Sequence, residues 1–284
     1  MATIFDGKKQ AAVKEKILAQ KVAQNHLRLK LVNIVVGDDP GSLLYLRVKQ
    51  KAAVRVGIDY EKKLFSADTK PAAIGEFVRR QNADPAVTGI MFQQPFPKDS
   101  RLKIQDSRIL NMIDPKKDVD CLTPTNLGLL LMGRPRFLPA TVKAIVEIIE
   151  NCLPHKALAK WGKLEIRSFT AVVLGVSNIV GKPLASHLTN LGATVTVCRS
   201  KTKDLAAVTR QADILISATG QPGLVGAEMV KKGAAVIDVG SPQGDVAFDQ
   251  VAPLASFVTP VPGGVGPMTV VCLLENVLQA GQAA

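Results

Sequence analysis

A glycine-rich turn between two apolar strands is the first place where this sequence could bind a ligand. The run 169–174 is almost wholly apolar or β-branched, and residues 175–181 (GVSNIVG) separate it from a helical pattern. In a βαβ unit such a turn offers backbone N–H groups and a helix N-terminus to the pyrophosphate of a dinucleotide. Ser177 replaces the expected second glycine and Gly181 comes one position late, so a turn that only joins strand to helix also fits.

The end of the second strand indicates which dinucleotide would bind. NAD-binding folds usually place an acidic residue there to accept from the ribose 2′-hydroxyl. This chain has Arg199-Ser200-Lys201-Thr202 instead. A cation and hydroxyl groups suit a 2′-phosphate, so NADP is favoured over NAD, although a solvated basic turn would have the same composition.

An aromatic ring and an amine share one face of a predicted helix in the first half of the chain. Tyr45 and Lys49 lie four positions apart. A surface lysine beside a half-buried tyrosine would look the same. Further on, Gln93 and Gln94 follow a predicted strand and enter a loop made rigid by Pro95 and Pro97, at a strand end where α/β proteins place ligands.

Two carboxylates, Asp118 and Asp120, stand at alternate positions in a polar turn. They could bind a metal or a cationic heterocycle, or could satisfy backbone N–H groups. No metal site is expected, because further acidic ligands are lacking nearby. The segment 259–269 is rich in Gly and Pro, which lets backbone approach a ligand closely but also suits a domain hinge.

The elements that must position these residues alternate along the chain, which predicts an α/β fold with parallel sheets. The helix with Tyr45 is predicted to be capped by Ser42, with Leu44, Val48, Ala52 and Val56 on its buried side. The other predicted helices are 8–25, 74–80, 141–153, 203–210, 227–232 and a C-terminal one to about 279. The predicted strands are 31–36, 63–66, 87–93, 169–174, 194–198, 213–218 and 234–239. Gly220 and Gly240 follow two of these strands and should line the cofactor crevice.

Bulk properties exclude several classes of protein. The 284 residues contain 47% hydrophobic residues but no apolar run of membrane-spanning length, and the N-terminus lacks the apolar core of a signal peptide, so a cytoplasmic protein is expected. Four cysteines and three histidines are scattered, which supports neither a zinc site nor a disulfide framework. The net charge of +12 is spread in pairs and aromatic residues are few, so nucleic acid is not an expected partner.

The segments described above, taken in order, resemble the bifunctional methylenetetrahydrofolate dehydrogenase/methenyltetrahydrofolate cyclohydrolase family over essentially the whole chain. The resemblance rests on Tyr45 with Lys49, the loop from Gln93, residues 117–120 (KDVD), the turn 175–183 and the segment 259–269. It implies NADP-dependent oxidation of 5,10-methylenetetrahydrofolate to the methenyl form, followed by hydrolysis to 10-formyltetrahydrofolate.

The resemblance also implies an architecture. Residues 1–139, completed by 267–284, would form an α/β folate-binding catalytic domain to which the C-terminal helix returns. Residues 140–266 would form a Rossmann-type domain that presents NADP across a cleft, and two chains would form a homodimer through these Rossmann-type domains. A small-molecule folate is thus the expected substrate, and neither a membrane nor nucleic acid is an expected partner.

Carried onto this chain, the resemblance gives each site residue a role. Lys49 would be the central catalytic group, Gln93 would contact and hold it, Tyr45 would stack on the pterin, and Asp120 would hydrogen-bond the pterin amino and ring nitrogens. The other expected substrate contacts are Pro262, Gly263 and Gly264. The expected cofactor contacts are Thr141, Gly175, Val176, Ser177, Ile179, Arg199, Ser200, Gly220, Gly240 and Ser241.

Elementary chemistry agrees with these roles. Hydride transfer needs mainly proximity and orientation, whereas hydrolysis of the methenyl cation needs a proton carrier. We therefore expect Lys49 to serve mainly the second step, with a pKa lowered by burial beside a cationic substrate.

The chain departs from the family pattern at several positions. Val176 stands where the family usually has Arg, and Arg199 where it has His, so Arg199 takes over the 2′-phosphate or NAD is also used. Cys121 replaces a glycine after Asp120, which affects the pterin pocket. Changes on both sides of Thr141, at Ala140 and Val142, affect its nicotinamide contact.

Two rival functions are less well supported by the residues. A dehydrogenase of small hydroxy or amino acids would want a His or an Arg pair for a substrate carboxylate, and His26, His155 and His187 do not lie at loop motifs. A regulatory protein that had kept the fold and lost turnover would not need the set of Tyr45, Lys49, Gln93 and Asp120.

Overall fold

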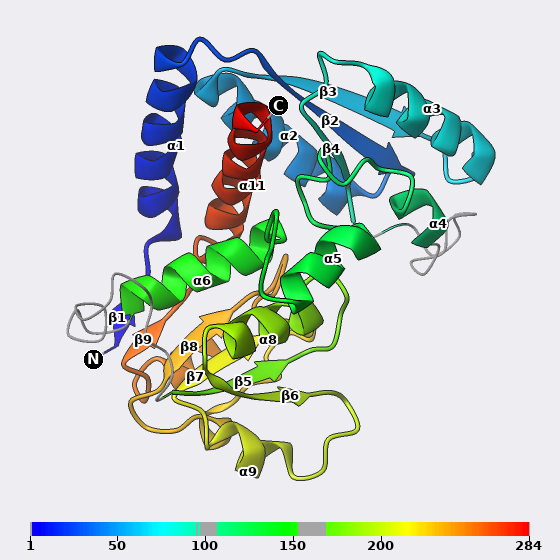
Figure 1. Ribbon diagram of the computed structural model, residues 1–284. Coiled ribbons are helices and arrows are strands. Elements are labelled where there is room, and N and C mark those ends of the chain that lie inside the picture. Colours follow the sequence, from blue (N-terminus) through cyan, green and yellow to red (C-terminus); the bar gives the residue numbers. More distant parts are fainter. Residues whose placement is uncertain (1, 95, 97–106, 153–168, 284) are drawn as a thin grey trace. The chain divides into compact units, whose positions relative to one another are not determined.

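Two compact units make up the computed structural model, which describes residues 2–94, 96, 107–152 and 169–283 (Figure 1). One unit comprises Ala12–Ala140 and Val270–Ala284, here called the catalytic unit, and the other comprises Met1–Ala11 and Thr141–Thr269, here called the dinucleotide unit. The predicted α/β class with parallel sheets is confirmed, because every strand pair in both sheets is parallel. Pro95, Pro97, Leu153 and His155, which figured in the sequence analysis, lie outside the described residues.

The catalytic unit contains a three-stranded sheet in the order β3-β2-β4. Its strands are β2 (Leu29–Val36), β3 (Ile58–Phe65) and β4 (Gly89–Phe92). Its helices are α1 (Gly7–Gln24, from Ala12), α2 (Pro40–Val56), α3 (Pro71–Ala83), α4 (Ser107–Leu110), α5 (Pro124–Leu131) and the part of α11 (Val265–Gln282) from Val270. One face of the sheet packs on α3 and α4 through a cluster that includes Ile34, Ile74, Phe77 and Phe92.

The dinucleotide unit contains a six-stranded sheet in the order β1-β9-β8-β7-β5-β6. Its strands are β1 (Thr3–Ile4), β5 (Thr170–Leu174), β6 (Thr194–Cys198), β7 (Ile214–Ser217), β8 (Ala235–Asp238) and β9 (Phe257–Val258). Its helices are α6 (Ala140–Cys152, from Thr141), α8 (Gly181–Asn190), α9 (Leu205–Thr209), the 3-10 turn η1 (Ala227–Met229) and α10 (Phe248–Val251). Strand order reverses between β5 and β7, which is the switch point where such sheets bind ligands.

The N-terminal residues group with the dinucleotide unit rather than with the folate domain expected for them. Thr3 and Ile4 extend the larger sheet by pairing with Phe257 and Val258. Gly7 then lies so close to the loop before α11 that a Cβ atom on it would be 1.9 Å from the carbonyl oxygen of Gly264. A two-residue strand is too short to show the alternation of apolar and polar residues, so the sequence could not predict this pairing.

Helix α2 carries Tyr45 and Lys49, and its sequence sets both ends. The Asp39 carboxylate accepts a hydrogen bond from Ser42 N at 2.7 Å, Pro40 occupies the first turn, and Gly57 ends the helix with a φ of 84°. The predicted cap at Ser42 was wrong, because the helix begins two residues earlier and Ser42 is a donor.

The buried face of α2 also differs from the prediction. Ala52 and Val56 are buried as predicted, but Leu44 and Val48 are 61% and 46% exposed, whereas Leu46, Lys49 and Ala53 are buried. The helix is thus rotated so that an amine, not only aliphatic side chains, faces the interior of the catalytic unit. Periodicity alone did not predict this, because it assigns apolar residues to the core and places no buried lysine there.

Two other predicted elements need correction. Residues 227–232 form only the 3-10 turn η1, since Val230 is already extended and Gly233 has a φ of 84°. The Gly and Pro content of 259–269 predicts irregular structure throughout, but α11 begins at Val265. Pro267 lies in the first turn of α11, where a missing N–H costs no helical hydrogen bond.

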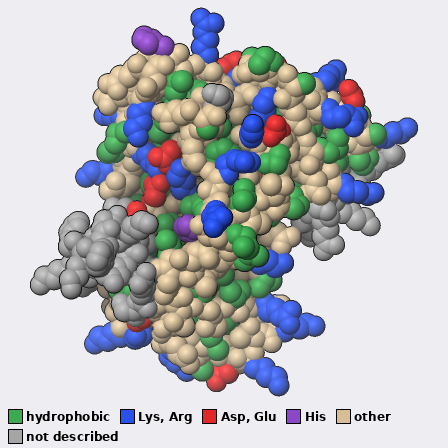
Figure 2. Space-filling view, in the orientation of Figure 1, with side chains coloured by type: hydrophobic (Ala, Val, Ile, Leu, Met, Phe, Trp, Pro, Cys, Tyr) green, Lys and Arg blue, Asp and Glu red, His purple; other side chains and the backbone are tan. Residues whose placement is uncertain are grey.

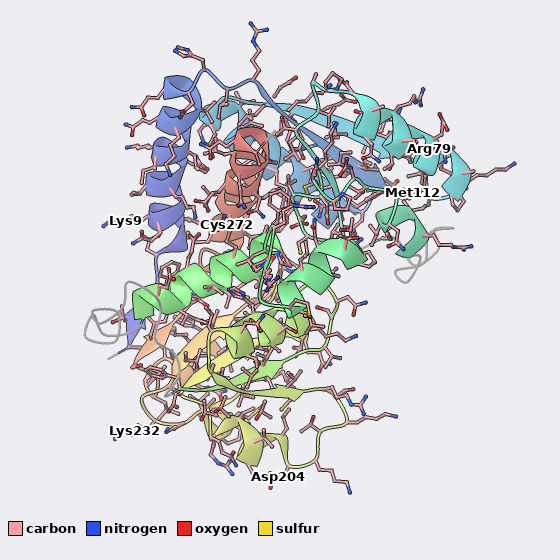
Figure 3. All side chains as sticks on the ribbon, in the orientation of Figure 1. Lys9, Arg79, Met112, Asp204, Lys232 and Cys272 are labelled. Atoms are coloured by element: carbon pink, nitrogen blue, oxygen red, sulfur yellow. The ribbon has the colours of Figure 1, made fainter. Side chains whose placement is uncertain are left out.

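Surface charge is dispersed in the structure as in the sequence. Figure 2 shows Lys and Arg side chains spread singly over the visible face. Acidic side chains cap or pair locally, as at Asp204, which caps α9 and is labelled in Figure 3. No helix in the described part of the chain combines the length and apolarity needed to cross a bilayer.

Candidate active site

A buried lysine lies at the centre of the candidate site in the catalytic unit. Lys49 is only 7% exposed, and its Nζ atom donates a hydrogen bond to Gln93 Oε1 at 2.9 Å. Met91 Sδ lies 4.0 Å from the same nitrogen. The Gln93 amide is itself fixed, since its Nε2 donates to the Gln94 carbonyl at 2.8 Å. The end of β4 thus supplies an oriented acceptor for an amine on α2.

The two carboxylates of the 118–120 turn have different surroundings. Asp118 is fully buried, and its oxygens accept hydrogen bonds from Leu122 N, Thr123 N, Thr123 Oγ1 and Asn126 Nδ2 at 2.7 to 2.9 Å. Asp118 therefore holds the start of α5. Asp120 is half-buried and accepts one described hydrogen bond, from Ala140 N at 3.1 Å. Of the alternatives open in the sequence, Asp118 satisfies backbone N–H groups and Asp120 keeps acceptor capacity for a ligand.

Burial shifts both ionisable groups of the site. Loss of hydration lowers the pKa of the Lys49 ammonium, and the negative charge of Asp120 opposes this change. Loss of hydration likewise raises the pKa of Asp120 to about 6, against the positive charge of Lys49 and the N–H of Ala140. The amine and the carboxylate interact electrostatically, so each opposes the pKa shift that burial causes in the other.

The other expected substrate contacts are divided between the units. Tyr45 is half-buried on α2, one turn before Lys49, in the catalytic unit. Pro262, Gly263 and Gly264 belong to the dinucleotide unit, in the loop between β9 and α11. Gly263 has a φ of 110°, which a side chain would strain, and a Cβ on Gly264 would lie 2.6 Å from the Pro260 carbonyl oxygen.

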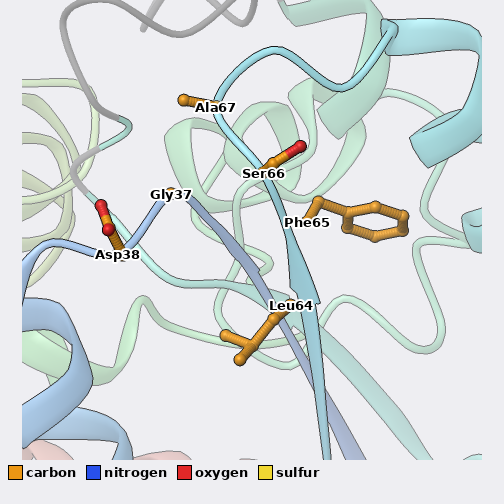
Figure 4. A pocket seen from close by; sticks show the side chains of 6 residues that line it. All are labelled: Gly37, Asp38, Leu64, Phe65, Ser66 and Ala67. Carbon is orange, nitrogen blue, oxygen red and sulfur yellow. The ribbon is translucent and has the colours of Figure 1, made fainter.

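A shallow hollow of about 400 Å³ lies at the carboxyl ends of β2 and β3 (Figure 4). It is lined by Gly37, Asp38, Leu64, Phe65, Ser66 and Ala67. None of the predicted catalytic side chains lines it, and it contains no buried charged group. The hollow is therefore not the site that the sequence points to.

The glycine turn of the dinucleotide unit has the shape that phosphate binding requires. Gly175 has a φ of 117°, and a Cβ on Gly181 would lie 2.0 Å from the Gly175 carbonyl oxygen, so the late glycine allows the close approach of turn and helix. Ser177 Oγ accepts from Val180 N at 3.1 Å and so stabilises the turn that leads into α8. Val176 and Ser177 are exposed and Ile179 is half-buried, so the turn can receive an anion.

The other expected cofactor contacts lie at strand ends or at a helix start. Arg199 and Ser200 are exposed directly after β6, where the Arg199 N–H donates to Thr202 Oγ1 at 2.9 Å. Gly220 follows β7, and Gly240 and Ser241 follow β8. Thr141 is half-buried in the first turn of α6. These residues fit a dinucleotide in the crevice at the carboxyl ends of the strands.

Two residues to which the sequence assigned no role, Met91 and Lys117, also build the site. Met91 alternates with Ile90 and Phe92 on β4 and so faces Lys49, a contact that strand periodicity could have suggested. Lys117 Nζ donates to the carbonyl oxygens of Gln81, Asn82 and Asp84 at 2.6 to 3.1 Å. It ties the end of α3 to the turn that carries Asp120, and only tertiary structure reveals this.

Fold and site together define an α/β enzyme with a Rossmann-type dinucleotide-binding unit and a separate catalytic unit built around a buried lysine. Comparison with known proteins gives the family. Residues 5–120 match the profile described as tetrahydrofolate dehydrogenase/cyclohydrolase, catalytic domain, and residues 139–284 match its NAD(P)-binding domain. The chain belongs to the tetrahydrofolate dehydrogenase/cyclohydrolase family.

Individual relatives agree over nearly full length. The bifunctional protein FolD of Exiguobacterium sibiricum is 41% identical, with 99% of this chain and 100% of the relative covered. The crystal structure of the bifunctional FolD of Campylobacter jejuni superposes with a TM-score of 0.89 at 36% identity, covering 100% of this chain and 99% of the other. The Trypanosoma brucei FolD, complexed with NADP and an inhibitor, also gives 0.89 at 36% identity, covering 99% and 98%.

The expected activity is confirmed by these matches. The chain is a bifunctional folate enzyme of one-carbon metabolism that oxidises 5,10-methylenetetrahydrofolate with NADP and hydrolyses the methenyl product to 10-formyltetrahydrofolate.

Proposed function

We propose that Lys49 is the proton carrier of the cyclohydrolase step, held in place by Gln93. The observation that carries this proposal is the buried Lys49 amine, hydrogen-bonded to Gln93 at 2.9 Å. A lysine with an ordinary pKa of ~10.4 gives up its proton too rarely at neutral pH to act as a shuttle. Burial lowers the pKa of Lys49 and so brings proton exchange toward the working pH.

The proposed step balances in protons. Water adds to the methenyl carbon, and the neutral Lys49 amine takes the proton that the attacking water loses. The resulting ammonium then protonates N5 of the folate as the bond between N5 and the one-carbon unit breaks, and the remaining hydroxyl proton is released to solvent as the formyl C=O forms. The formyl group remains on N10, and Lys49 returns to the amine that began the cycle.

The substrate is proposed to be held by the groups next to Lys49. Tyr45, half-buried one turn before Lys49, stacks on the pterin ring. Ionised Asp120 accepts hydrogen bonds from the pterin amino group and ring N–H, because its carboxylate has acceptor sites beyond the one used by Ala140. Pro262, Gly263 and Gly264 provide backbone contacts to the same substrate.

In the dehydrogenase step the residues bind and orient rather than transfer protons. NADP, when bound, supplies the hydride acceptor. Gly175, Val176, Ser177 and Ile179 are proposed to hold its pyrophosphate by backbone N–H groups at the start of α8, a role supported by the positive φ of Gly175. The remaining proposed contacts are Thr141, Gly220, Gly240 and Ser241.

Selection of NADP is assigned to Arg199 with Ser200. Both side chains are exposed directly after β6, the position from which Rossmann-type folds read the adenosine ribose. The Arg199 guanidinium can form charge-assisted hydrogen bonds with a 2′-phosphate. Val176 leaves the other side of this site without the cation usual in the family, so some use of NAD is also expected.

The domain division and the assembly are also proposals. Residues 1–139 with 267–284 are assigned to folate binding and catalysis, and 140–266 to NADP binding, with residues 1–11 packing in the dinucleotide unit. A homodimer is proposed through the dinucleotide units, because β6 is an edge strand with Thr194, Thr196 and Val197 exposed. Light scattering during gel filtration should give about twice the chain mass of 30.3 kDa, and a monomer would refute the dimer. A cytoplasmic location is proposed as well.

Absorbance of the purified protein tests the two activities directly. With 5,10-methylenetetrahydrofolate and NADP, absorbance of the reduced nicotinamide should rise. With methenyltetrahydrofolate alone, absorbance of the methenyl form should decay faster than in buffer. A protein that catalysed neither change would contradict the proposed site.

A further inference from the structure

Two buried aspartates lie where the loops after β7, β8 and β9 meet in the dinucleotide unit. Asp238 ends β8 and is 3% exposed, and Asp245 follows seven residues later and is fully buried. Neither carboxylate is paired with a cation in the described part of the chain. Burying two carboxylates without cations costs free energy, so their hydrogen bonds must do something that an apolar pair could not.

Asp245 ties the loop after β7 to the loop after β8. Its Oδ2 atom accepts hydrogen bonds from Ser217 Oγ at 2.9 Å, Thr219 N at 2.7 Å, Thr219 Oγ1 at 2.9 Å and Gly220 N at 3.3 Å. The single Oδ2 atom of Asp245 thus accepts from Ser217, Thr219 and Gly220, and these bonds fix the backbone at Gly220. Its Oδ1 atom is buried without a hydrogen-bond partner in the described structure. The hydrogen bonds that this buried carboxylate accepts in the described structure are therefore all made by Oδ2.

Asp238 holds Asp245 in place. Its oxygens accept from Gly240 N at 2.8 Å, Asp245 N at 3.0 Å and Val246 N at 3.0 Å, which closes the loop after β8 on itself. This closure leaves no room for side chains, because a Cβ on Gly240 would lie 2.6 Å from Asp245 N and one on Gly244 would lie 2.5 Å from Asp238 Oδ2. Thr259 Oγ1 accepts from Asp238 N at 2.8 Å and joins the loop after β9 to the same cluster.

The cluster lies under the half of the crevice that takes nicotinamide. The glycine turn after β5 faces the pyrophosphate and the end of β6 faces the adenosine ribose, which leaves β7 and β8, across the switch point, for the nicotinamide nucleotide. This step rests on the proposed function, in which Gly220 and Gly240 contact the cofactor. The nitrogen of each glycine donates to one of the two aspartates.

We propose that Asp245 is a positioning residue for the dehydrogenase reaction. It acts through the backbone of Gly220 and, with Asp238, of Gly240, and fixes the two loops that orient nicotinamide. The cyclohydrolase reaction needs no dinucleotide and so does not depend on this cluster. Loss of Asp245 therefore separates the two activities.

Binding of NADPH, followed by its own fluorescence, together with both activities tests this inference in the full-length protein. Asp245→Ala should raise the NADPH dissociation constant by about tenfold or more and lower dehydrogenase kcat/KM. Ser217→Ala, which removes one of the four donors, should produce a smaller change in the same direction. Cyclohydrolase kcat/KM, measured on methenyltetrahydrofolate without dinucleotide, should stay within about twofold for both variants.

Asp213→Asn is the matched control, because this carboxylate lies just before the other end of β7 and pairs with Lys231 at the surface. It should leave NADPH affinity unchanged. An unchanged NADPH affinity in Asp245→Ala, or parallel loss of both activities, would overturn the inference. If Asp245→Ala does not fold, Ser217→Ala and Thr219→Val carry the same test. Failure of the unmodified protein to bind NADPH would instead refute the proposed function.

Discussion

Asp118 and Asp120 show how two identical side chains in one turn acquire different tasks. Asp118 accepts hydrogen bonds from Leu122, Thr123 and Asn126 and fixes the turn. Asp120 accepts one described bond, from Ala140, and burial raises its pKa to about 6. A carboxylate with spare acceptors suits the proposed hydrogen bonds to a pterin, and the fixed neighbour holds it in place.

The raised pKa of Asp120 predicts how folate binding depends on pH. Above about pH 6 the carboxylate is ionised and can accept from the pterin, and below it the proton removes that acceptor. The KM for the folate substrate should therefore rise as pH falls through about 6. Michaelis constants measured from pH 5 to 8 check this. The same inflection in Asp120→Asn, whose side chain does not titrate, would show that another group is responsible.

The single side chain of Arg199 is expected to determine the preference for NADP over NAD. Arg199→Ala should raise the KM for NADP by about tenfold or more, because one charge-assisted contact with the 2′-phosphate is lost, and should change the KM for NAD far less. Lys203→Ala, which removes another exposed cation four residues on, is the control and should alter neither. Equal effects of Arg199→Ala on both dinucleotides would contradict the assignment.

At the scale of elements, α2 carries both Tyr45 and Lys49, to which the proposed chemistry assigns substrate stacking and proton transfer. Its start is fixed by the Asp39 carboxylate, whose pKa is lowered chiefly by the hydrogen bond from the Ser42 backbone N–H. A carboxyl with a lowered pKa stabilises the native state above its ordinary pKa and loses that contribution as pH falls through the lowered one.

Asp39→Ala should therefore lower the melting temperature at pH 7, because the first turn of α2 loses its cap. The difference from the unmodified protein should shrink as pH falls below about 4 and the carboxylate becomes protonated. Thermal unfolding followed by circular dichroism measures both effects. Asp38→Ala, at an exposed neighbour that does not cap, is the control; an equal loss there would exclude capping as the cause.

Most elements could be predicted from periodicity, but their orientation could not. Strand β6 was predicted at 194–198 and lies there, because β-branched residues between glycine and a polar turn leave little choice. The buried face of α2 was predicted only in part, because Ala52 and Val56 are buried but Lys49 faces inward and Leu44 and Val48 are exposed. The local spacing of apolar residues indicates that a helix is amphipathic. Burial of the Lys49 amine depends instead on its hydrogen bond to Gln93, which is distant in the sequence.

The candidate site was partly readable from sequence for the same reason. Lys49, Gln93 and Asp120 were named because motif resemblance preserves their order along the chain. Asp245 and Lys117 were not singled out for their contacts, since their partners lie 25 to 36 residues away and no local spacing signals them. The residues proposed to contact ligands thus lie in recognisable motifs, whereas residues that hold loops together are visible only in the folded chain.

At the scale of the whole molecule, folate binding and dinucleotide binding are proposed to belong to different units. The dinucleotide unit spans 141–269 and recruits the first eleven residues, and the catalytic unit recruits the chain after Val270. Each unit is thus completed by a distant part of the sequence. Variants within one unit can therefore separate the two activities, provided that the residue changed serves only one of them.

Lys49→Met tests the central claim most directly, because methionine keeps the length and apolar character of the side chain and removes only the amine. Both activities should be measured on the same preparation, with unchanged NADPH affinity as evidence of a native dinucleotide unit. We expect cyclohydrolase turnover to fall by about a hundredfold or more and dehydrogenase turnover to fall much less. Intact cyclohydrolase turnover in Lys49→Met would show that the proton travels by another route.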